Sequence, residues 1–509
     1  MSDSHGVTRR EAIRYIIAGA AAAACPFPGA LRAADKTPVR LGSEDFQLCH
    51  RLRDGEEFRF PLPAEEREVV IIGGGPSGLM AAYLLRQTDF LLLEKESRLG
   101  GNAIPEQWKG VWYSTGAAYQ GSPEMAEFCR EIGMEIRLIR SVDAAIIQDK
   151  LVPRFWAGGF WDSPYPQNVK KNFARFVDDM KKLDLEASAA KLDAMSFAQL
   201  LMPYGPELKL WFDNFGPNNW GADAESTSAL IGAQSVYWAG GQEPDRYTWA
   251  GGLGRISLAL EEKIEKLASG RLRKPATVLR VEHRGTRVHV SYHESGEMRT
   301  VAARAVVIAC PKFVAKRLIA GLDDDHREAM EQMRYAPYLV ANVCSREVIY
   351  NRSYDTNIPA PSLVVDFNVA DWVVNRDSKN LHRPAVLTCY LPRPEEERAL
   401  VLDDEYVLGL GEKVVEHLDR WFPGARQKIE EVRIYRRGHA MFLAAPGVLT
   451  RLAPRIRKPL GSIFFAHSDS EGGVSEYSTA LAAARRASRE AMAHLGKQAA
   501  RDSVQVLAG

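Results

Sequence analysis

The stretch EVVIIGGGPSGLMAAYLLRQ, at residues 68–87, decides the fold class of this chain. Its apolar run at 69–72 predicts a buried strand, and the glycine-rich turn that follows leads into a predicted helix. A second apolar run, DFLLLEK at 89–95, predicts another buried strand. Strand, helix and strand over this length form a parallel βαβ unit, so we expect an α/β protein with a Rossmann-like domain.

The turn has the spacing of a nucleotide site, because Gly73, Gly75 and Gly78 form GxGxxG between the strand and the helix. Such glycines let the backbone approach a pyrophosphate, and the helix N-terminus offers free N–H groups. Glu94 ends the second strand, where an acid accepts hydrogen bonds from ribose hydroxyls. Together these residues predict a dinucleotide whose ribose has a free 2′-hydroxyl.

In the run LLLEKESRLGGNA, at 91–103, Arg98 and the pair Gly100–Gly101 follow Glu94. A site for NAD does not need these residues. This E-x-x-x-R-x-G-G pattern, in register with GxGxxG, resembles the large family of flavoproteins that includes monoamine oxidase, protoporphyrinogen oxidase and phytoene desaturase. The resemblance implies FAD as the cofactor. It also implies that the glycine pair lets the chain pass close to the FAD phosphates and ribityl group.

Three further segments extend the resemblance along the chain. STGAAY at 114–119 resembles the segment that passes the flavin ring, and WAGGLGRISLAL at 249–260 resembles the return to the FAD domain. AVVIACP at 305–311 resembles the last strand before the chain re-enters the substrate domain.

The segment IFFAHSDSEGGVSEYSTALAAARRA, at 463–487, resembles the family's closing FAD motif. The resemblance implies that Asp469 contacts the ribityl group and that a helix begins at 474–476, facing the flavin pyrimidine. His467 and Ser468 depart from the usual pattern, which has a glycine and then the acid. This departure leaves His467 as either a group at the flavin edge or a packed histidine, and we favour the packed histidine.

The motifs and the resemblance together define the residues expected at the site. The expected FAD-binding residues are Gly73, Gly75, Pro76, Ser77, Gly78, Glu94, Lys95, Arg98, Gly100, Gly101, Asn102, Gly116, Ala117, Ala118, Val278, Asp469, Val474 and Ser475. The candidates for a catalytic side chain are His467, Tyr119 and Trp249, and none of them is assigned as a base.

The chain has no second glycine-rich dinucleotide turn and no CxxC pair among its six cysteines. We therefore expect electrons to enter FAD from a small organic substrate, as a hydride to flavin N5, and to leave to oxygen, a quinone or a carrier. The absence of CxxC also leaves no sign of a zinc ribbon, and no metal is expected.

The favoured substrate is an amine, in an oxidase or dehydrogenase reaction. Relatives that resemble monoamine oxidase place a lysine near flavin N5 from a strand of the substrate domain. The matching region here, MRYAPYLVANV at 333–343, contains no lysine. Two alternatives therefore stay open: a desaturase or dehydrogenase acting on a carbon substrate of polyene or isoprenoid type, and a non-catalytic binding protein on the same fold.

The N-terminal sequence TRREAIRYIIAGAAAAACPFPGAL, at 8–31, predicts a twin-arginine export signal. The apolar run at 16–24 is too short to cross a bilayer, which takes about 20 residues. We expect residues 1–34 to be the signal, the twin-arginine machinery to be a partner, and the protein to be periplasmic or exported. The leucine that usually precedes a lipidated cysteine is missing before Cys25, so no lipid anchor is expected, nor any transmembrane helix in the mature chain.

The formal net charge of +1 over 509 residues argues against nucleic acid as a partner, since phosphate binding needs a concentrated basic face. The length predicts two domains. The expected layout is interleaved: an N-terminal arm at 35–67, an FAD-binding domain at 68–112, 245–312 and 455–497, an α+β substrate domain with an antiparallel sheet and a helical cap at 113–244 and 313–454, and a tail at 498–509.

Local patterns predict several further elements. Ser122 is expected to cap a helix, residues 196–199 to form a capping box, and residues 276–297 to form a hairpin. The helical region at 164–240 is expected to break at Pro203, Gly205 and Pro217. The tryptophans of the expected substrate domain, among them Trp156, Trp211 and Trp220, suit either a packing role or an aromatic substrate wall, and for any single tryptophan we favour packing. Asp213 and Asn214 are either polar substrate contacts or a surface turn.

Overall fold

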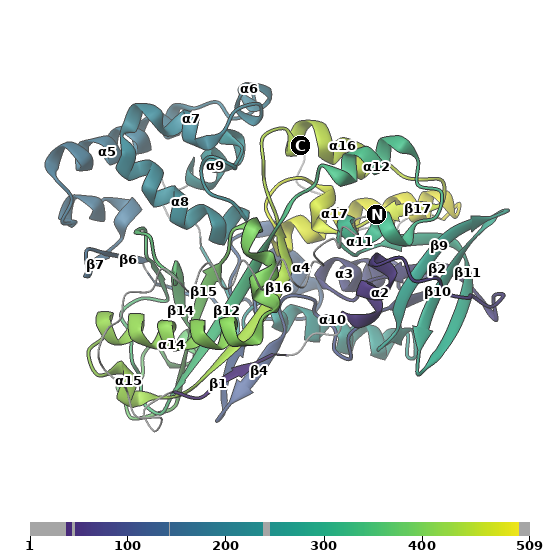
Figure 1. Cartoon of the computed structure of the whole chain (residues 1–509), viewed down its shortest axis with the longest axis horizontal. Helices are drawn as coiled ribbons and strands as arrows, with labels where there is room; N and C mark the ends of the chain where they lie inside the picture. The colour runs from purple at the N-terminus through teal and green to yellow at the C-terminus, as the bar shows by residue number, and fades with distance from the viewer. Residues whose placement is uncertain (1–36, 43–45, 142, 238–244, 498–509) are drawn as a thin grey trace, which may run out of the picture. The chain divides into compact units, whose positions relative to one another are not determined.

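The structure, a computed structural model, describes residues 37–42, 46–141, 143–237 and 245–497 (Figure 1). The predicted export signal, Cys25 and the C-terminal tail lie outside these residues. Among the described residues, no helix is both long enough and apolar enough to cross a membrane.

The predicted βαβ unit forms the centre of a seven-stranded sheet. Its parallel part has the strand order β8-β3-β2-β11-β17, and the N-terminal half of β11 turns away to pair with an antiparallel hairpin. The strands are β2 (Glu65–Ile72), β3 (Phe90–Leu93), β8 (Leu272–Arg273), β9 (Thr277–Arg284), β10 (Arg287–Glu294), β11 (Glu297–Ile308) and β17 (Ile463–Phe465).

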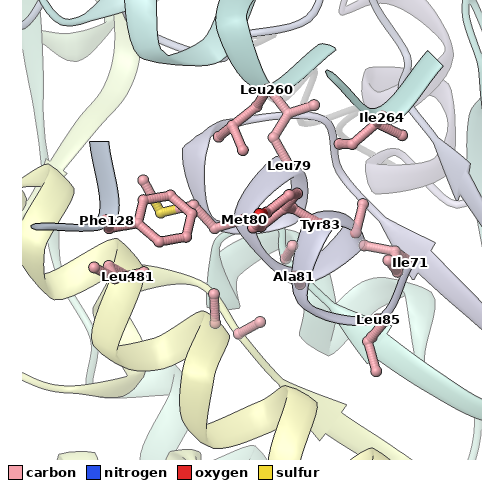
Figure 2. Close-up of a cluster of buried hydrophobic side chains, with 14 of the residues drawn as sticks. Ile71, Leu79, Met80, Ala81, Tyr83, Leu85, Phe128, Leu260, Ile264 and Leu481 are labelled. Carbon is pink, nitrogen blue, oxygen red and sulfur yellow. The ribbon is translucent and has the colours of Figure 1, made fainter. Parts of the chain in front are cut away.

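Alternate residues of these strands enter two different apolar clusters, because successive side chains of a strand point to opposite faces. One cluster packs under α3 (Pro76–Leu84), α10 (Gly254–Leu267), α17 (Tyr477–His494) and α4 (Pro123–Glu131), as Figure 2 shows around Leu79 and Leu260. The other contains residues of the hairpin and of α11 (Lys312–Leu318), α12 (Asp324–Glu331) and α16 (Ala453–Ile456). The sheet is therefore buried on both faces, as continuous apolar strands require.

A second sheet of eight strands has the order β1-β16-β12-β15-β14-β13-β6-β7. One of its faces is apolar and packs against α14 (Asp404–Trp421) (Figure 1). The strands are β1 (Val39–Leu41), β6 (Ala144–Ile147), β7 (Lys150–Pro153), β12 (Tyr335–Ser345), β13 (Asp355–Asn357), β14 (Asp366–Val369), β15 (Ala385–Pro392) and β16 (Ile429–Phe442).

A group of helices follows β7 and encloses an aromatic core that includes Trp156, Trp211 and Trp220. The core role that we favoured for single tryptophans therefore holds for these three residues. The helices are α5 (Gln167–Lys182), α6 (Ala189–Asp193), α7 (Phe197–Leu201), α8 (Pro206–Trp220) and α9 (Ala229–Tyr237).

The remaining elements are short. They are the helices α2 (Gln47–Arg53), α13 (Trp372–Asn375) and α15 (Ala425–Lys428) and the hairpin of β4 (Pro105–Trp108) and β5 (Val111–Ser114). The short 3₁₀- or π-helical segments are η2 (Phe155–Ala157), η3 (Gly159–Asp162), η4 (Met202–Tyr204), η6 (Glu395–Leu402), η7 (Val448–Leu452) and η8 (Ser468–Ser470).

The α/β fold class is confirmed, as are the cap at Ser122, the capping box that begins at Ser196 and the hairpin of β9 and β10. The predicted break at Pro217 is wrong, because α8 runs through it to Trp220 and buries Trp211 and Trp220. The helix predicted to begin at 474–476 begins at Tyr477.

The predicted arm holds two regular elements of its own. Its strand β1 adds to the second sheet alongside β16, and α2 follows it. The strand predicted at 69–72 also extends back to Glu65. The division into FAD-binding and substrate domains remains a prediction.

Candidate functional site

The carboxyl ends of four parallel strands meet at one edge of the seven-stranded sheet. Gly73 follows β2, Glu94 follows β3, Lys312 lies shortly after β11 and Asp469 shortly after β17. The strand order reverses direction at β2, which pairs with β3 on one side and β11 on the other. Ligands of doubly wound sheets bind at such a switch point, so this edge is the candidate site.

The start of α3 lies at this edge and has no side-chain cap. Its N-cap residue is Gly75 and its first residue is Pro76, which has no N–H group. A Cβ atom at Gly78 would lie 1.8 Å from the carbonyl oxygen of Gly73, so only glycine allows this turn to close. The first turn of the helix therefore presents backbone N–H groups and a partial positive charge suited to a phosphate.

The second glycine pair lies against this turn. The amide of Gly100 donates to the carbonyl of Gly74 at 2.9 Å, and Gly101 has φ +60°. A Cβ atom at Gly101 would lie 3.1 Å from Cα of Gly75. The two motifs, which are about 25 residues apart in the chain, thus form one surface of bare backbone.

Glu94 is only 8% exposed and is held by backbone amides. Its Oε2 accepts from the amide of Gly74 at 2.5 Å, and its Oε1 accepts from the amide of Glu96 at 2.8 Å. Burial raises the pKa of Glu94, although these two hydrogen bonds oppose the shift. Each oxygen keeps a further lone pair, which is what an acceptor for ribose hydroxyls needs.

The side chain of Arg98 is bound to the strand β4. Its Nη1 lies 2.9 Å from Oε1 of Glu106, and its Nη2 donates to the carbonyl of Pro105 at 2.9 Å. Lys95, the other basic residue of the motif, contacts Glu96. Neither cation contacts the glycine turn through these bonds.

The segment at 114–119 adjoins the second glycine pair. The amide of Thr115 donates to the carbonyl of Ile104 at 3.0 Å, and a Cβ atom at Gly116 would lie 2.2 Å from the carbonyl oxygen of Asn102. The segment also meets α10, because the amide of Leu253 donates to the carbonyl of Ala117 at 3.1 Å. The structure thus brings together three of the segments predicted to surround FAD.

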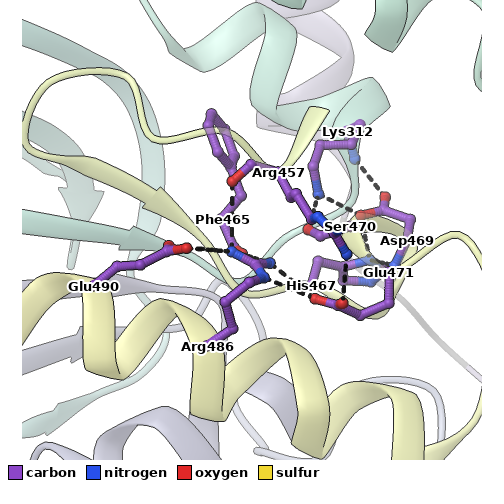
Figure 3. Close-up of polar contacts among 9 residues, drawn as sticks. All are labelled: Lys312, Arg457, Phe465, His467, Asp469, Ser470, Glu471, Arg486 and Glu490. Atoms are coloured by element: carbon purple, nitrogen blue, oxygen red, sulfur yellow. Dashed lines mark hydrogen bonds and ion pairs between the residues drawn. The ribbon is translucent and has the colours of Figure 1, made fainter. Parts of the chain in front are cut away.

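Asp469 and Lys312 form a buried ion pair at the same edge (Figure 3). Oδ2 of Asp469 accepts from the amide of Lys312 at 2.9 Å and from the hydroxyl of Tyr335 at 2.6 Å. Nζ of Lys312 donates to Oδ1 of Asp469 and, at 2.7 Å, to Oγ of Ser470. The predicted ribityl contact thus has its carboxylate directed at protein donors, and Lys312 is a residue that no motif indicated.

The pKa of Asp469 reflects this setting. Burial alone would raise the pKa, but the nearby His467 and Lys312 outweigh burial and hold the pKa of Asp469 well below its usual value. Nδ1 of His467 lies 3.1 Å from Oδ1 of Asp469, and its side chain is 24% exposed. His467 therefore faces the ion pair from the more open side.

The other predicted residues lie in different settings. Trp249 is in the apolar cluster under α3 and donates from Nε1 to the carbonyl of Glu135 at 2.8 Å, which is a structural role. Val278 is buried in the opposite apolar cluster. Val474 and Ser475 precede α17 and are partly buried.

The second sheet turns a buried polar face toward the segment at 114–119. The strands β12, β15, β14 and β13 lie side by side, and residues that pair across them form two rows on that face. The rows are Asn342, Thr388, Asn368 and Asp355, and Val340, Tyr390, Asp366 and Asn357.

Two hydrogen bonds join this face to the segment. Nδ2 of Asn342 donates to the carbonyl of Ser114 at 3.1 Å, and the hydroxyl of Tyr390 donates to the carbonyl of Gly116 at 3.1 Å. The sequence motifs did not indicate this face. The available signal was the alternation of polar and apolar residues in strands that are buried throughout.

The residues at the sheet edge fit FAD. An uncapped helix start and two adjoining glycine loops suit its phosphates, and the buried acceptor Glu94 suits a ribose.

Comparisons with known proteins agree with this geometry. The family model described as flavin containing amine oxidoreductase matches residues 76–492. Flavin-containing amine oxidase A of Sus scrofa is 24% identical over 476 residues, which cover 86% of this chain and 86% of that protein.

Two solved structures have the same fold. Cyclohexylamine oxidase from Brevibacterium oxydans aligns with a TM-score of 0.66 and 18% identity over 85% of this chain and 100% of its own. Wild-type putrescine oxidase bound to putrescine aligns with a TM-score of 0.65 and 20% identity over 84% of this chain and 99% of its own. The chain therefore belongs to the flavin-containing amine oxidoreductase family and is an FAD-dependent oxidoreductase.

Proposed function

We propose that the substrate of this enzyme is an amine. When bound, FAD supplies a hydride acceptor for the carbon beside an unprotonated nitrogen. The proteins matched above are named as amine oxidases, which supports the proposal. The observation that carries it is the polar face of the second sheet, directed at the segment at 114–119 that the family resemblance assigns to the flavin ring.

This face suits an amine because its hydroxyl and amide groups lie beside aromatic rings. Tyr338 and Tyr390 pack with ring centroids 6.1 Å apart at 75°, in a cluster with Ala118 and Val340. Tyrosine rings attract cations and their hydroxyls form hydrogen bonds with amines. A polyene substrate would instead favour a wholly apolar wall.

Asn342 organises the site rather than titrating in it. Its Nδ2 donates to Ser114, and its Oδ1 accepts from Oγ1 of Thr388 at 2.7 Å, so its amide groups are engaged and the segment at 114–119 is held in place. The strand β12 contains no lysine. We infer that the amine arrives already unprotonated or loses its proton to solvent.

Anaerobic reduction of the purified holoprotein tests the proposal directly. Primary amines are expected to bleach the visible flavin spectrum, whereas carbon substrates such as carotenes are not. If polyenes bleach the flavin and amines do not, the desaturase interpretation replaces this one. A protein that carries no flavin after purification and binds none when FAD is added would favour the binding protein.

We also propose that the enzyme is exported by the twin-arginine pathway and works in the periplasm. The order of Arg9–Arg10, the short apolar run and the small residues supports this. Because FAD is made in the cytoplasm, the folded holoprotein must cross the membrane. Replacing both arginines with lysine is expected to retain the flavoprotein in the cytoplasm, and unchanged export would contradict the proposal.

A further inference from the structure

We propose that the preferred amines carry a second, positively charged nitrogen, as α,ω-diamines do, and that Asp355 and Asp366 bind that nitrogen. This inference depends on the proposed amine oxidation. The two aspartates lie on adjacent strands of the polar face, β13 and β14. Asp355 opposes Asn368 and Asp366 opposes Asn357, so the two acids are diagonal neighbours.

Both acids are buried and incompletely satisfied. Asp355 is 2% exposed and Asp366 is 5% exposed. Oδ2 of Asp366 accepts from Nδ2 of Asn218 at 3.0 Å, and Oδ2 of Asp355 lies 3.4 Å from Nη1 of Arg246. Within the described part of the chain, Oδ1 of neither acid meets a donor from any other residue, and the two carboxyl groups are within hydrogen-bond reach of each other. Buried carboxylate oxygens are seldom left so, because desolvation without a partner is costly.

The charges around the pair are unequal. Arg246 forms ion pairs with Asp355 and Asp143 and also interacts electrostatically with Asp366. One positive charge is therefore shared among three acids. Burial first, and then repulsion by Asp355, hold the pKa of Asp366 well above its usual value. The pair therefore keeps a proton when no ligand is present, and an ammonium group would replace that proton with three N–H donors.

Aromatic rings complete the surroundings of the acids. Tyr119 and Tyr354 pack at 5.8 Å with an interplanar angle of 77°, and the guanidinium of Arg246 lies 4.8 Å from the centroid of Tyr119. Tyr390 pairs with Asp366 in the register and donates its hydroxyl to Gly116. Tyr390 thus links Asp366 to the segment at 114–119, which the family resemblance assigns to the flavin ring.

An acidic pocket adjoins this region. It has a volume of about 340 Å³ and lies between α8 and the ends of β12 and β15. Val365 lines the pocket and also packs in the cluster of Tyr338 and Tyr390. The charged residues that line it are Asp213, Asp223, Glu395, Glu396, Arg334 and Arg393, four acids against two bases. Asp213 is paired with Lys209, and Glu395 is paired with Arg334 and Arg398, so the excess negative charge comes from Asp223 and Glu396 and favours the approach of a cation.

The structure also decides between the two interpretations of Asp213 and Asn214. Both residues lie within α8 and line this pocket, so they are not a surface turn. Oδ2 of Asp213 binds Nζ of Lys209 at 2.8 Å, and Nδ2 of Asn214 donates to the carbonyl of Ala360 at 2.7 Å. They form part of the pocket wall, and the lining residue Val365 directly precedes Asp366 in the chain.

The test compares diamines with monoamines of equal chain length in anaerobic flavin reduction. The unaltered holoprotein is measured with α,ω-diaminoalkanes and n-alkylamines of three to six carbons. A charged hydrogen bond contributes about 1.5–3 kcal/mol, so we expect a diamine preference of roughly 10–100-fold that peaks at one chain length. A preference that is absent, or a rate that rises steadily with chain length for both series, would overturn the proposal.

The variant Asp366→Asn is expected to reduce the ratio of diamine to monoamine rates at least tenfold. The matched control is Asp371→Asn, since Asp371 is also a buried acid that is paired with an arginine, Arg383, and keeps an unpartnered oxygen. The control is expected to leave the ratio unchanged. An unchanged ratio in Asp366→Asn refutes the acid pair while amine oxidation stands, whereas no bleaching by any amine refutes amine oxidation itself.

Discussion

Nζ of Lys312 donates a hydrogen bond to Oδ1 of Asp469, and neither side chain has any exposed surface. The bond joins the ends of two neighbouring parallel strands, β11 and β17, at the edge where FAD is expected. Tyr335 and Ser470 satisfy the remaining groups of the pair. A buried ion pair gains little over an apolar pair, but removing one partner leaves a charge in a medium that cannot solvate it.

The variant Lys312→Met is therefore expected to lower the free energy of unfolding by about 3–5 kcal/mol. Arg420→Met is the control, because Arg420 pairs with Asp149 on the surface and both side chains are about half exposed or more. That change is expected to cost less than about 1 kcal/mol. Chemical denaturation of both holoproteins measures the difference. Equal losses of unfolding free energy in the two variants would show that the buried pair contributes no more to stability than the surface pair.

The same pair predicts how stability depends on pH. The pKa of Asp469 is lower in the folded chain than in the unfolded chain, so its contribution is present above the ordinary aspartate pKa of about 3.9. It is lost as the pH falls below that value, because the unfolded chain takes up the proton first. In Lys312→Met this acid loss is expected to be smaller, which denaturation at pH 3 and pH 7 measures.

Gly78 is the residue on which the nucleotide turn depends. In Gly78→Ala the new Cβ atom would meet the carbonyl oxygen of Gly73, so the turn must open. We expect a loss of bound flavin and destabilisation of at least about 2 kcal/mol, as for other overpacked sites. Gly409→Ala in α14 is the control, since nothing lies within 4 Å of a Cβ atom there. A Gly78→Ala protein with full flavin content would contradict the assigned role of the turn.

Glu94 is expected to bind the ribose of FAD. Glu94→Gln keeps one acceptor oxygen but removes the charge, and hydrogen bonds to charged groups contribute about 1.5–3 kcal/mol. We therefore expect the Kd of the apoprotein for FAD to rise roughly 10–100-fold, measured by quenching of flavin fluorescence. Glu416→Gln, on an exposed position of α14, is the control. A Kd that does not change would remove Glu94 from the site.

The glycine motifs were predictable because their requirements are local. The close approaches at Gly78 and Gly101 depend on residues within about 30 positions, and short-range spacing is visible in a sequence. The strands β2 and β3 were predictable for the same reason, since each contains a continuous apolar run, and the hairpin of β9 and β10 was predictable from its alternation. The two-residue strand β8 gave no such signal. The start of α17 was missed by one to three residues, which is usual for element boundaries.

The polar parts of the site depend on partners that are distant in sequence. Lys312 and Asp469 are 157 positions apart, and Asn342 reaches Ser114 across 228 positions. In the sequence, the polar residues of β12 and β15 resemble the solvated side of a half-buried sheet. Only the folded chain shows that the segment at 114–119 covers this side of the sheet. The polar residues of the alternating pattern are therefore buried rather than solvated.

Asp366 is expected to make the parent protein less stable than the variant Asp366→Asn at neutral and alkaline pH. Its pKa is raised in the folded chain, because it is buried beside Asp355. The unfolded chain releases this proton near pH 3.9, whereas the folded chain holds it, so stability falls as the pH rises through and above that value. Asp366→Asn removes this loss and supplies an N–H donor for Oδ1 of Asp355.

We therefore expect Asp366→Asn to raise the free energy of unfolding at pH 8 by about 0.5–2 kcal/mol, with little difference at pH 4. Asp469 titrates in both proteins and cancels from the comparison. Thermal and chemical unfolding at the two pH values measure the effect. A variant that is more stable than the parent and yet discriminates poorly between diamines and monoamines would mark Asp366 as a residue kept for binding. A variant that is less stable at pH 8 would mark it as structural.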